Sequence, residues 1–242
     1  MIEESAPIPA ATLIVMRDRA DGPPDLLMLE RSAAMRFAAG ALVFPGGRIE
    51  ESDGPLDTDD DTAPRIAAIR ETIEEARIAV ALTPEPEPAA VARLAEALRA
   101  GAGLASLLEA EGLSADPAAL TPFARWRPNF RETRAFDARF YLARATGSAT
   151  PEPDGVECVA AFWVSAEAIL ASGRPLLFPT RRNLERLARF RSFAEAARDA
   201  RRHPPRLITP VVERRPDGDW LTIPEDLGYP VTAERLDRAR RS

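Results

Sequence analysis

Residues 68–78 read Ala-Ile-Arg-Glu-Thr-Ile-Glu-Glu-Ala-Arg-Ile (AIRETIEEARI). At about 100° per residue, the carboxylates of this stretch share one sector of a helical wheel about 100° wide. They are Glu71, Glu74 and Glu75. Isoleucines 66, 69 and 73 fall on the opposite side of the wheel. The pattern predicts a helix from Thr62 to about Glu75, with Thr62 as its N-cap. One face of this helix packs against a sheet, and the other presents acid.

The acidic face needs a compensating group. Like charges three or four positions apart destabilise a helix by roughly 0.2–0.5 kcal/mol per pair. Hard divalent cations take oxygen ligands, so the cluster predicts a site for Mg²⁺ or Mn²⁺. The alternative is an acidic face exposed to solvent, and the composition of the helix alone would favour it.

The segment before the helix favours the metal site. Residues 41–44 form an apolar, strand-like run that leads directly into Pro45, Gly46 and Gly47. Two glycines allow backbone N–H groups and a phosphate to approach closely. Gly46 and Gly47 are therefore predicted to bind the substrate.

Together, VFPGGRIEESD (43–53) and AIRETIEEARI (68–78) resemble the Nudix box. By position, Gly47 matches the box glycine and Asp53 the first glutamate, while Arg70 and the three glutamates match identically. The resemblance implies that Glu71, Glu74 and Glu75 ligate divalent metals and that Arg70 belongs to the catalytic group. It also implies an α+β fold, an α/β/α sandwich with a central mixed sheet between helices.

Three departures from the box concern its loop and helix end. The spacer between Asp53 and Arg70 is sixteen residues, longer than the usual pattern. Thr72 replaces an aliphatic residue, and Arg77 replaces the glycine that ends the helix. A residue other than glycine in the left-handed conformation there costs roughly 1 kcal/mol.

The enlarged loop is similar to that of the branch resembling peroxisomal coenzyme A diphosphatases. This resemblance implies hydrolysis of a phosphoanhydride bond in coenzyme A or acyl-CoA, giving 3′,5′-ADP and phosphopantetheine. ADP-ribose or a dinucleoside polyphosphate is an alternative substrate. A degenerate Nudix module that only binds a ligand is the alternative from another functional class, although it would have little need for a self-repelling glutamate cluster.

Further residues are candidates for the site. The Nudix pattern often places an additional metal-binding or base-like glutamate before the strand that carries a tryptophan, and Glu157 lies six residues before Trp163. Arg31 and Arg36 could clamp phosphates through their forked donors. Each of these residues also has an ordinary surface role as its alternative.

Acidic and aromatic residues outside the box give less specific predictions of function. Aspartates 57 and 59–61 indicate a solvated loop and a helix start more than a metal site. Trp126 and Tyr141 could stack on a base, but aromatic residues more often belong to the core.

The element order predicts strands, helix, strands and helix within one domain, residues 1–242. It includes a helical insertion at 84–122 and a C-terminal extension at 205–242. Periodicity predicts strands at 10–16, 26–30, 41–44, 78–82, 135–142 and 159–164, and helices at 62–75, 89–111 and 181–202. The strand at 135–142 is expected to bury one face only. The insertion is expected to break near Gly101 and Gly103.

Composition excludes several functional classes. All 32 basic residues are arginine, so no Schiff-base or P-loop lysine exists. The only cysteine, Cys158, and the only histidine, His203, exclude a thiolate zinc site and make a histidine triad improbable. A net charge of −6 argues against nucleic acid as a partner. We expect a cytoplasmic enzyme without membrane contact that acts on a small nucleoside diphosphate derivative; a homodimer is compatible with the family resemblance.

Overall fold

The computed structural model describes residues 6–35, 38–56, 61–127 and 135–239. At its centre lies a mixed sheet in the order β10-β7-β8-β1-β2-β3, in which β4 also pairs with β1 and β9 with β2. Its strands are β1 (Ile8–Arg17), β2 (Asp25–Arg31), β3 (Leu42–Val43), β4 (Gly46–Arg48), β7 (Thr121–Trp126), β8 (Phe136–Arg144), β9 (Cys158–Ser165) and β10 (Leu207–Ile208). The parallel pairing of β1 with β8 joins segments far apart in the sequence.

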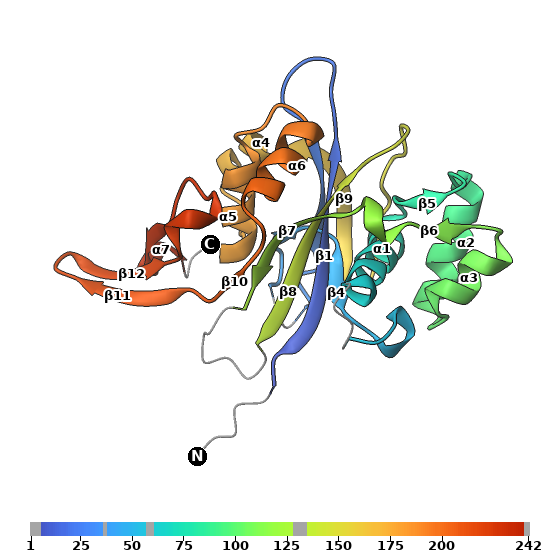
Figure 1. The fold of residues 1–242 in the computed structure, drawn as a ribbon, viewed down its shortest axis with the longest axis horizontal. Coiled ribbons are helices and arrows are strands. Elements are labelled where there is room, and N and C mark those ends of the chain that lie inside the picture. Colours follow the sequence, from blue (N-terminus) through green and yellow to red (C-terminus); the bar gives the residue numbers. More distant parts are fainter. Residues whose placement is uncertain (1–5, 36–37, 57–60, 128–134, 240–242) are drawn as a thin grey trace.

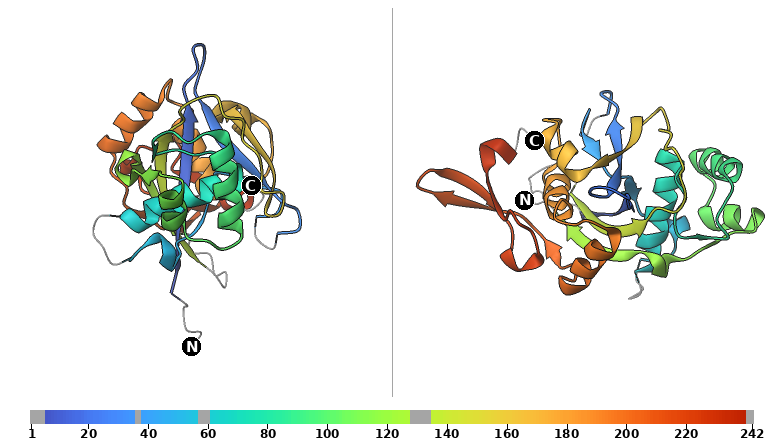
Figure 2. Two further views of the ribbon diagram at one scale, coloured as in Figure 1. Left: turned by 90° about the vertical axis from the view of Figure 1, so that its right-hand side faces the viewer. Right: turned by 90° about the horizontal axis from the view of Figure 1, so that it is seen from above.

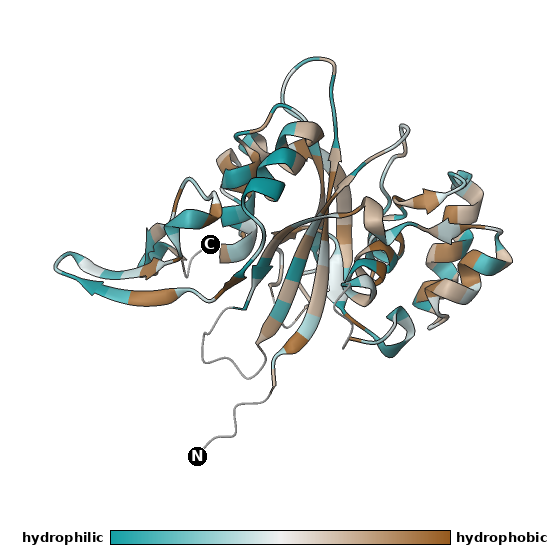
Figure 3. Cartoon of the chain, viewed as in Figure 1, coloured by the Kyte–Doolittle hydropathy of each residue, from teal (hydrophilic) through white to brown (hydrophobic). Residues whose placement is uncertain are grey.

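Helices cover both faces of this sheet (Figures 1 and 2). One face carries α4 (Ala166–Ala171), α5 (Phe178–Leu187) and α6 (Phe193–Arg202). The other carries α1 (Thr62–Ala76), with α2 (Pro88–Arg99) and α3 (Leu104–Ala110) packed outside it. Apolar residues line the central strands and the inserted helices (Figure 3). This layered arrangement confirms the predicted α+β fold.

Two hydrophobic cores lie on opposite faces of the sheet, and β8 contributes to both. Phe140 and Leu142 enter one core, while Tyr141 and Ala143 enter the other. The predicted alternation of β8 is correct, but the expectation of a single buried face is wrong, because α1 covers the face that carries Tyr141.

Two helix predictions need correction. The N-cap of α1 is Asp61, in the left-handed conformation, and not Thr62. The carboxylate of Asp61 contacts Arg139 and the hydroxyl of Tyr141, so it does not cap the helix. The single helix predicted at 181–202 is two helices, because Ser192 accepts a hydrogen bond from the backbone N–H of Glu195 and starts α6.

The strand predicted at 78–82 is also wrong. Only β5 (Leu82–Thr83) forms there, pairing with β6 (Ser114–Ala115). Arg77 and Ala81 have φ near +50° (52° and 55°), which interrupts an extended backbone, yet Ile78 and Val80 are buried in the core. Apolar side chains at 78–82 thus reflect burial without strand pairing.

The insertion and the C-terminal extension form the two ends of the molecule (Figure 1). The break between α2 and α3 at Gly101, whose φ is 88°, confirms the predicted break in the insertion. The extension folds as β11 (Val211–Arg215), β12 (Gly218–Thr222) and β13 (Ala233–Arg235), followed by α7 (Leu236–Ala239). Short 3-10 turns lie at Glu51–Asp53, Pro117–Ala119 and Glu225–Leu227. No described helix is long and apolar enough to cross a bilayer.

A buried ion pair ties α5 to α6 and to the sheet. The Nε of Arg186 donates to Asp199 at 2.9 Å, and its Nη1 donates to the carbonyl of Phe123 in β7 at 3.1 Å. The side chain of Arg186 is 1% exposed. Its removal would leave the carboxylate of Asp199 buried without its main cation.

We therefore expect Arg186→Ala to lower the free energy of unfolding by about 3–5 kcal/mol, the cost of breaking a buried ion pair from one side. Urea denaturation measures this change. The exposed Arg191, at the turn between the two helices, gives a matched control, and Arg191→Ala should stay within about 0.5 kcal/mol of the wild type. Equal unfolding midpoints for the two variants would contradict the assignment.

Candidate metal and phosphate site

The carboxylates of the site lie on the C-terminal half of α1. Ile69 and Ile73 of this helix are fully buried against the sheet, which turns the opposite face toward β4 and the box loop. The observed helix therefore has the two faces that the helical wheel predicts.

Gly46 and Gly47 bring β4 close to this helix. β4 pairs antiparallel with β1, which fixes the loop to the sheet. A Cβ atom on Gly47 would lie 2.3 Å from a carboxylate oxygen of Glu71, and one on Gly46 would lie 2.5 Å from the carbonyl of Ala11. The N–H of Gly46 donates to Glu75 at 2.9 Å. Only glycine fits at position 46, where the contact is with backbone, whereas a Cβ atom at position 47 would force the carboxylate of Glu71 to move. The role of both glycines toward a phosphate stays a prediction.

Arg70 connects the box loop to the carboxylates. Its Nε and Nη2 donate to the two oxygens of Asp53 at 2.8 and 3.0 Å, and Nη2 also donates to the carbonyl of Arg48. Its Nη1 lies 3.0 Å from Glu71 and 3.5 Å from Glu74. Asp53 also accepts the N–H of Glu50 at 2.8 Å. Arg70 is therefore a positioning residue, and Asp53 its buried partner.

Burial shifts the three glutamates toward protonation. Desolvation raises the pKa of Glu71 to about 7, with Arg70 opposing this shift and Glu74 adding to it. Desolvation, followed by the charge of Glu71, holds the pKa of Glu75 well above its usual range. The pKa of Glu74 is also raised, mainly by desolvation. Two of these carboxylates, Glu71 and Glu74, thus share one guanidinium that is already bound to Asp53, and Glu75 has no contact with it.

Arg31 and Glu157 lie beside this cluster. Arg31 is 3.6 Å from Glu157, and its positive charge lowers the pKa of Glu75 while Glu157 raises it. The Nε of Arg31 is buried and has no hydrogen-bond partner among the described residues. The structure brings both predicted residues to the site. Arg36 lies outside the described residues.

Cys158 lies against the deepest carboxylate. Its Sγ is 3.9 Å from Glu75, and burial raises the pKa of its thiol, so it is an uncharged neighbour of that glutamate.

Sequence reasoning missed Glu50 and Asp154. Both place negative charge near Glu74 and raise its pKa. Asp154 also accepts the N–H groups of Val156 and Cys158 at 2.9 Å, which shapes the turn that carries Glu157. The signal for Glu50 was its place within the box stretch, three residues after the second glycine.

A solved structure shares this architecture over most of both chains. It is a NUDIX hydrolase from Alicyclobacillus acidocaldarius, 29% identical, with a TM-score of 0.69 over 80% of this chain and 96% of that one. The chain has the Nudix hydrolase fold. Together with the box glutamates, this similarity supports the prediction of an enzyme of that class.

A NUDIX-family hydrolase from Clostridium perfringens is a more distant match, 16% identical with a TM-score of 0.45, covering 80% of this chain and 97% of that one. No family model matches the sequence.

Two departures from the Nudix box have a structural explanation. Thr72 is fully buried, and its hydroxyl donates to the carbonyl of Ala68 at 2.7 Å, so the polar group has a partner. Arg77 ends the helix in the left-handed conformation, with its N–H bonded to Ile73, and its guanidinium donates to Glu152 at 2.7 Å. The third departure, the long spacer, includes residues 57–60, which lie outside the described residues; so do Asp57, Asp59 and Asp60 of the acidic cluster.

The remaining candidates have other roles. Trp126 and Tyr141 are buried in the two cores, as the alternative reading expected. His203 contacts Asp199 at 3.2 Å.

The residues of the site fit a hard divalent cation in chemical type. They offer carboxylate oxygens, desolvated and in excess over the nearby positive charge. Within the described ranges, however, no three His, Cys, Asp or Glu side chains converge as a ready-made metal centre. Glu71 and Glu74 contact Arg70, and Glu75 accepts the N–H of Gly46.

The raised pKa of Glu71 predicts a pH-dependent response to metal. Between pH 4.5 and about 7 the folded chain binds more protons than the unfolded chain, so metal-free stability falls as pH rises through this window. A bound divalent cation favours the ionised carboxylates and opposes this loss.

Added Mg²⁺ should therefore raise the Tm more at about pH 8 than at about pH 5.5. Each increment of about 1–2 kcal/mol that the ion adds to the free energy of unfolding corresponds to a few degrees in Tm. Thermal unfolding in EDTA and in MgCl₂ measures the difference, with NaCl at matched ionic strength as the control. An equal gain in Tm at both pH values would show that the glutamates do not bind the ion.

Proposed function

We propose that the chain is a metal-dependent hydrolase that cleaves a phosphoanhydride bond in a nucleoside diphosphate derivative, with coenzyme A or acyl-CoA as the first candidate. The observation that carries this proposal is the cluster of desolvated glutamates packed against Gly46 and Gly47. A site of this kind is costly to fold without cations, so a binding module that never meets metal would have little reason to build it.

Glu71, Glu74 and Glu75 would hold Mg²⁺ or Mn²⁺, with Glu157 as a further ligand. When bound, these ions polarise the phosphate oxygens and lower the pKa of an attacking water. Arg70 keeps Glu71 and Glu74 in place through its contacts with Asp53 and Arg48.

Glu74, within the cluster, and Arg31, beside it, would serve in proton transfer and in phosphate binding. Glu74 is the most exposed of the three box glutamates, so it can exchange a proton with solvent. The unpartnered Nε of Arg31 offers a donor to a phosphate oxygen next to Glu75.

The substrate is decided by incubating the protein with Mg²⁺ or Mn²⁺ and coenzyme A, acyl-CoA, ADP-ribose or diadenosine polyphosphates, then identifying products by mass. Coenzyme A should yield 3′,5′-ADP and phosphopantetheine. Faster turnover of ADP-ribose or a dinucleoside polyphosphate would select the alternative substrate. No turnover with either metal would rule out catalysis.

Loss of a residue that only hydrogen-bonds to a metal ligand typically lowers activity by roughly 10–100-fold. Glu74→Gln should reduce kcat by more than this, because it removes a charged ligand itself. Its Tm in EDTA should not fall, since desolvation and then repulsion from Glu50 and Asp154 raise the pKa of Glu74, so the variant removes an unfavourable charge. Glu167→Gln, an exposed change on α4, should leave kcat unchanged. If the Glu74→Gln enzyme is active, Glu74 is not a metal ligand.

A further inference from the structure

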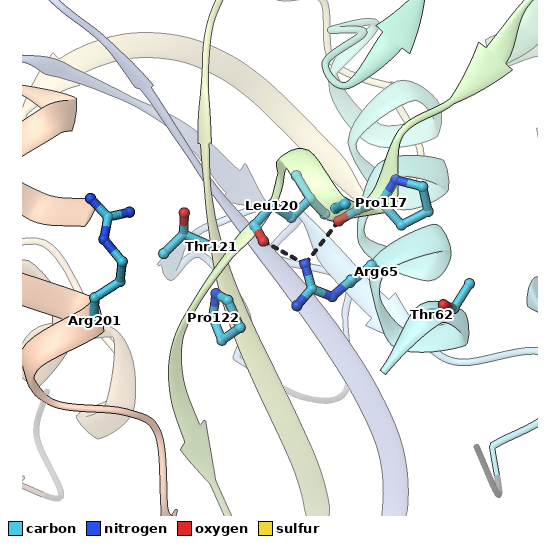
Figure 4. A pocket seen from close by; sticks show the side chains of 8 residues that line it. Thr62, Arg65, Pro117, Leu120, Thr121, Pro122 and Arg201 are labelled. Atoms are coloured by element: carbon cyan, nitrogen blue, oxygen red, sulfur yellow. Dashed lines mark hydrogen bonds between the residues drawn. The ribbon is translucent and has the colours of Figure 1, made fainter. Parts of the chain in front are cut away.

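A pocket lies at the N-terminal end of α1, away from the box glutamates. Its volume is about 480 Å³, and it opens between α1, the segment that leads into β7, and α6 (Figure 4). The residues that line it are Thr62, Arg65, Pro117, Ala118, Leu120, Thr121, Pro122 and Arg201. This lining contains two guanidinium groups and no carboxylate.

Arg65 is only partly used by the fold. Its Nη1 donates to the carbonyls of Pro117 and Leu120 at 2.8 and 2.5 Å, and its guanidinium lies 5.3 Å from the ring centre of Tyr141. These contacts fix the position of the group. Its Nε is buried without an acceptor among the described residues, and its Nη2 takes no part in the two hydrogen bonds to the carbonyls.

Arg201 faces the same pocket from α6 (Figure 4). Its residue is exposed, and its guanidinium makes no ion pair or hydrogen bond within the described part of the chain. The nearby carboxylate of Asp61 is already bound by Arg139 and by the hydroxyl of Tyr141. Neither lining arginine therefore has a carboxylate partner in the described ranges, although the chain as a whole carries a net charge of −6.

We infer that this pocket binds the phosphate group of a small phosphorylated molecule. A guanidinium forms strong, charge-assisted hydrogen bonds to phosphate oxygens, and Arg65 is held in place by the carbonyls of Pro117 and Leu120 with its Nη2 left to donate to the ligand. Arg201 supplies a second positive charge from the opposite wall. The remaining lining of proline, alanine and threonine leaves room for an uncharged organic part, since pockets of roughly 300–1,000 Å³ take small ligands.

This site is distinct from the proposed hydrolase site and does not depend on a metal. Inorganic phosphate is the probe, titrated by calorimetry into the full chain in EDTA at constant ionic strength, with chloride as the competing anion. The wild type should bind one phosphate per chain. Arg201→Gln should weaken binding about tenfold, the loss of one charge-assisted contact.

Two further variants test the assignment. Arg198→Gln changes an exposed arginine on the same helix that does not line the pocket, and it should bind as the wild type does. Arg65→Lys keeps the charge, but one ammonium would have to bind the carbonyls of Pro117 and Leu120 as well as the phosphate, so it should also weaken binding. Its Tm reports whether the turn at 117–120 is intact.

The inference is overturned if the wild type takes up no phosphate, or if Arg201→Gln and Arg198→Gln bind it equally. Because the titration excludes metal, either result leaves the hydrolase proposal intact. Conversely, an inactive enzyme that still binds phosphate through Arg201 would count only against the hydrolase.

Discussion

The fork of Arg70 is the interaction on which the site depends. One guanidinium binds both oxygens of Asp53, the carbonyl of Arg48 and the carboxylate of Glu71. It thereby connects the loop after β4 to the acidic face of α1. Without it, the loop would lose its fixed position, and Glu71 would be buried next to Glu74 and Glu75 with no nearby cation. Packing and charge are thus coupled at a single buried side chain.

The same arrangement opposes stability. Burial raises the pKa of all three box glutamates, so folding opposes their ionisation. A hydrophobic residue at these positions would cost less to bury. The fold tolerates the cluster because Ile69 and Ile73 bury the opposite face of α1 in a core that also includes β1 and β2. A packed apolar face therefore supports an acidic one.

Local periodicity was enough to predict α1, the strands β1 and β2, and the break in the insertion. In each case a repeating pattern or a glycine determines the backbone. It failed at residues 78–82, where Ile78 and Val80 are apolar but Arg77 and Ala81 adopt positive φ. A pattern of apolar residues in the sequence predicts burial but not the backbone angle φ. A buried irregular segment therefore has the same sequence pattern as a short strand.

In the site, sequence predicted the residue types and their shared face, but not their partners. Asp53 occupies a position where the box has glutamate, and nothing in the sequence shows that the turn at 51–53 brings its shorter side chain to Arg70. The effect of the charges of Glu50 and Asp154 on the pKa of Glu74 likewise depends on the path of two loops. Interactions between segments far apart in the chain are fixed by tertiary packing, which spacing alone does not encode.

The absence of lysine gives these contacts a common chemistry. Every buried cation in this chain is a guanidinium, which can bind a carboxylate and a carbonyl at once in one plane. Arg70 and Arg186 both do so. A compact ammonium presents its donors from one point and is more strongly hydrated, so it would lose more on burial. Arg65 shows the further consequence: two carbonyls bind to its Nη1, and its Nη2 makes neither of those hydrogen bonds in a side chain that lines a pocket. A side chain that organises the fold can therefore also bind a ligand.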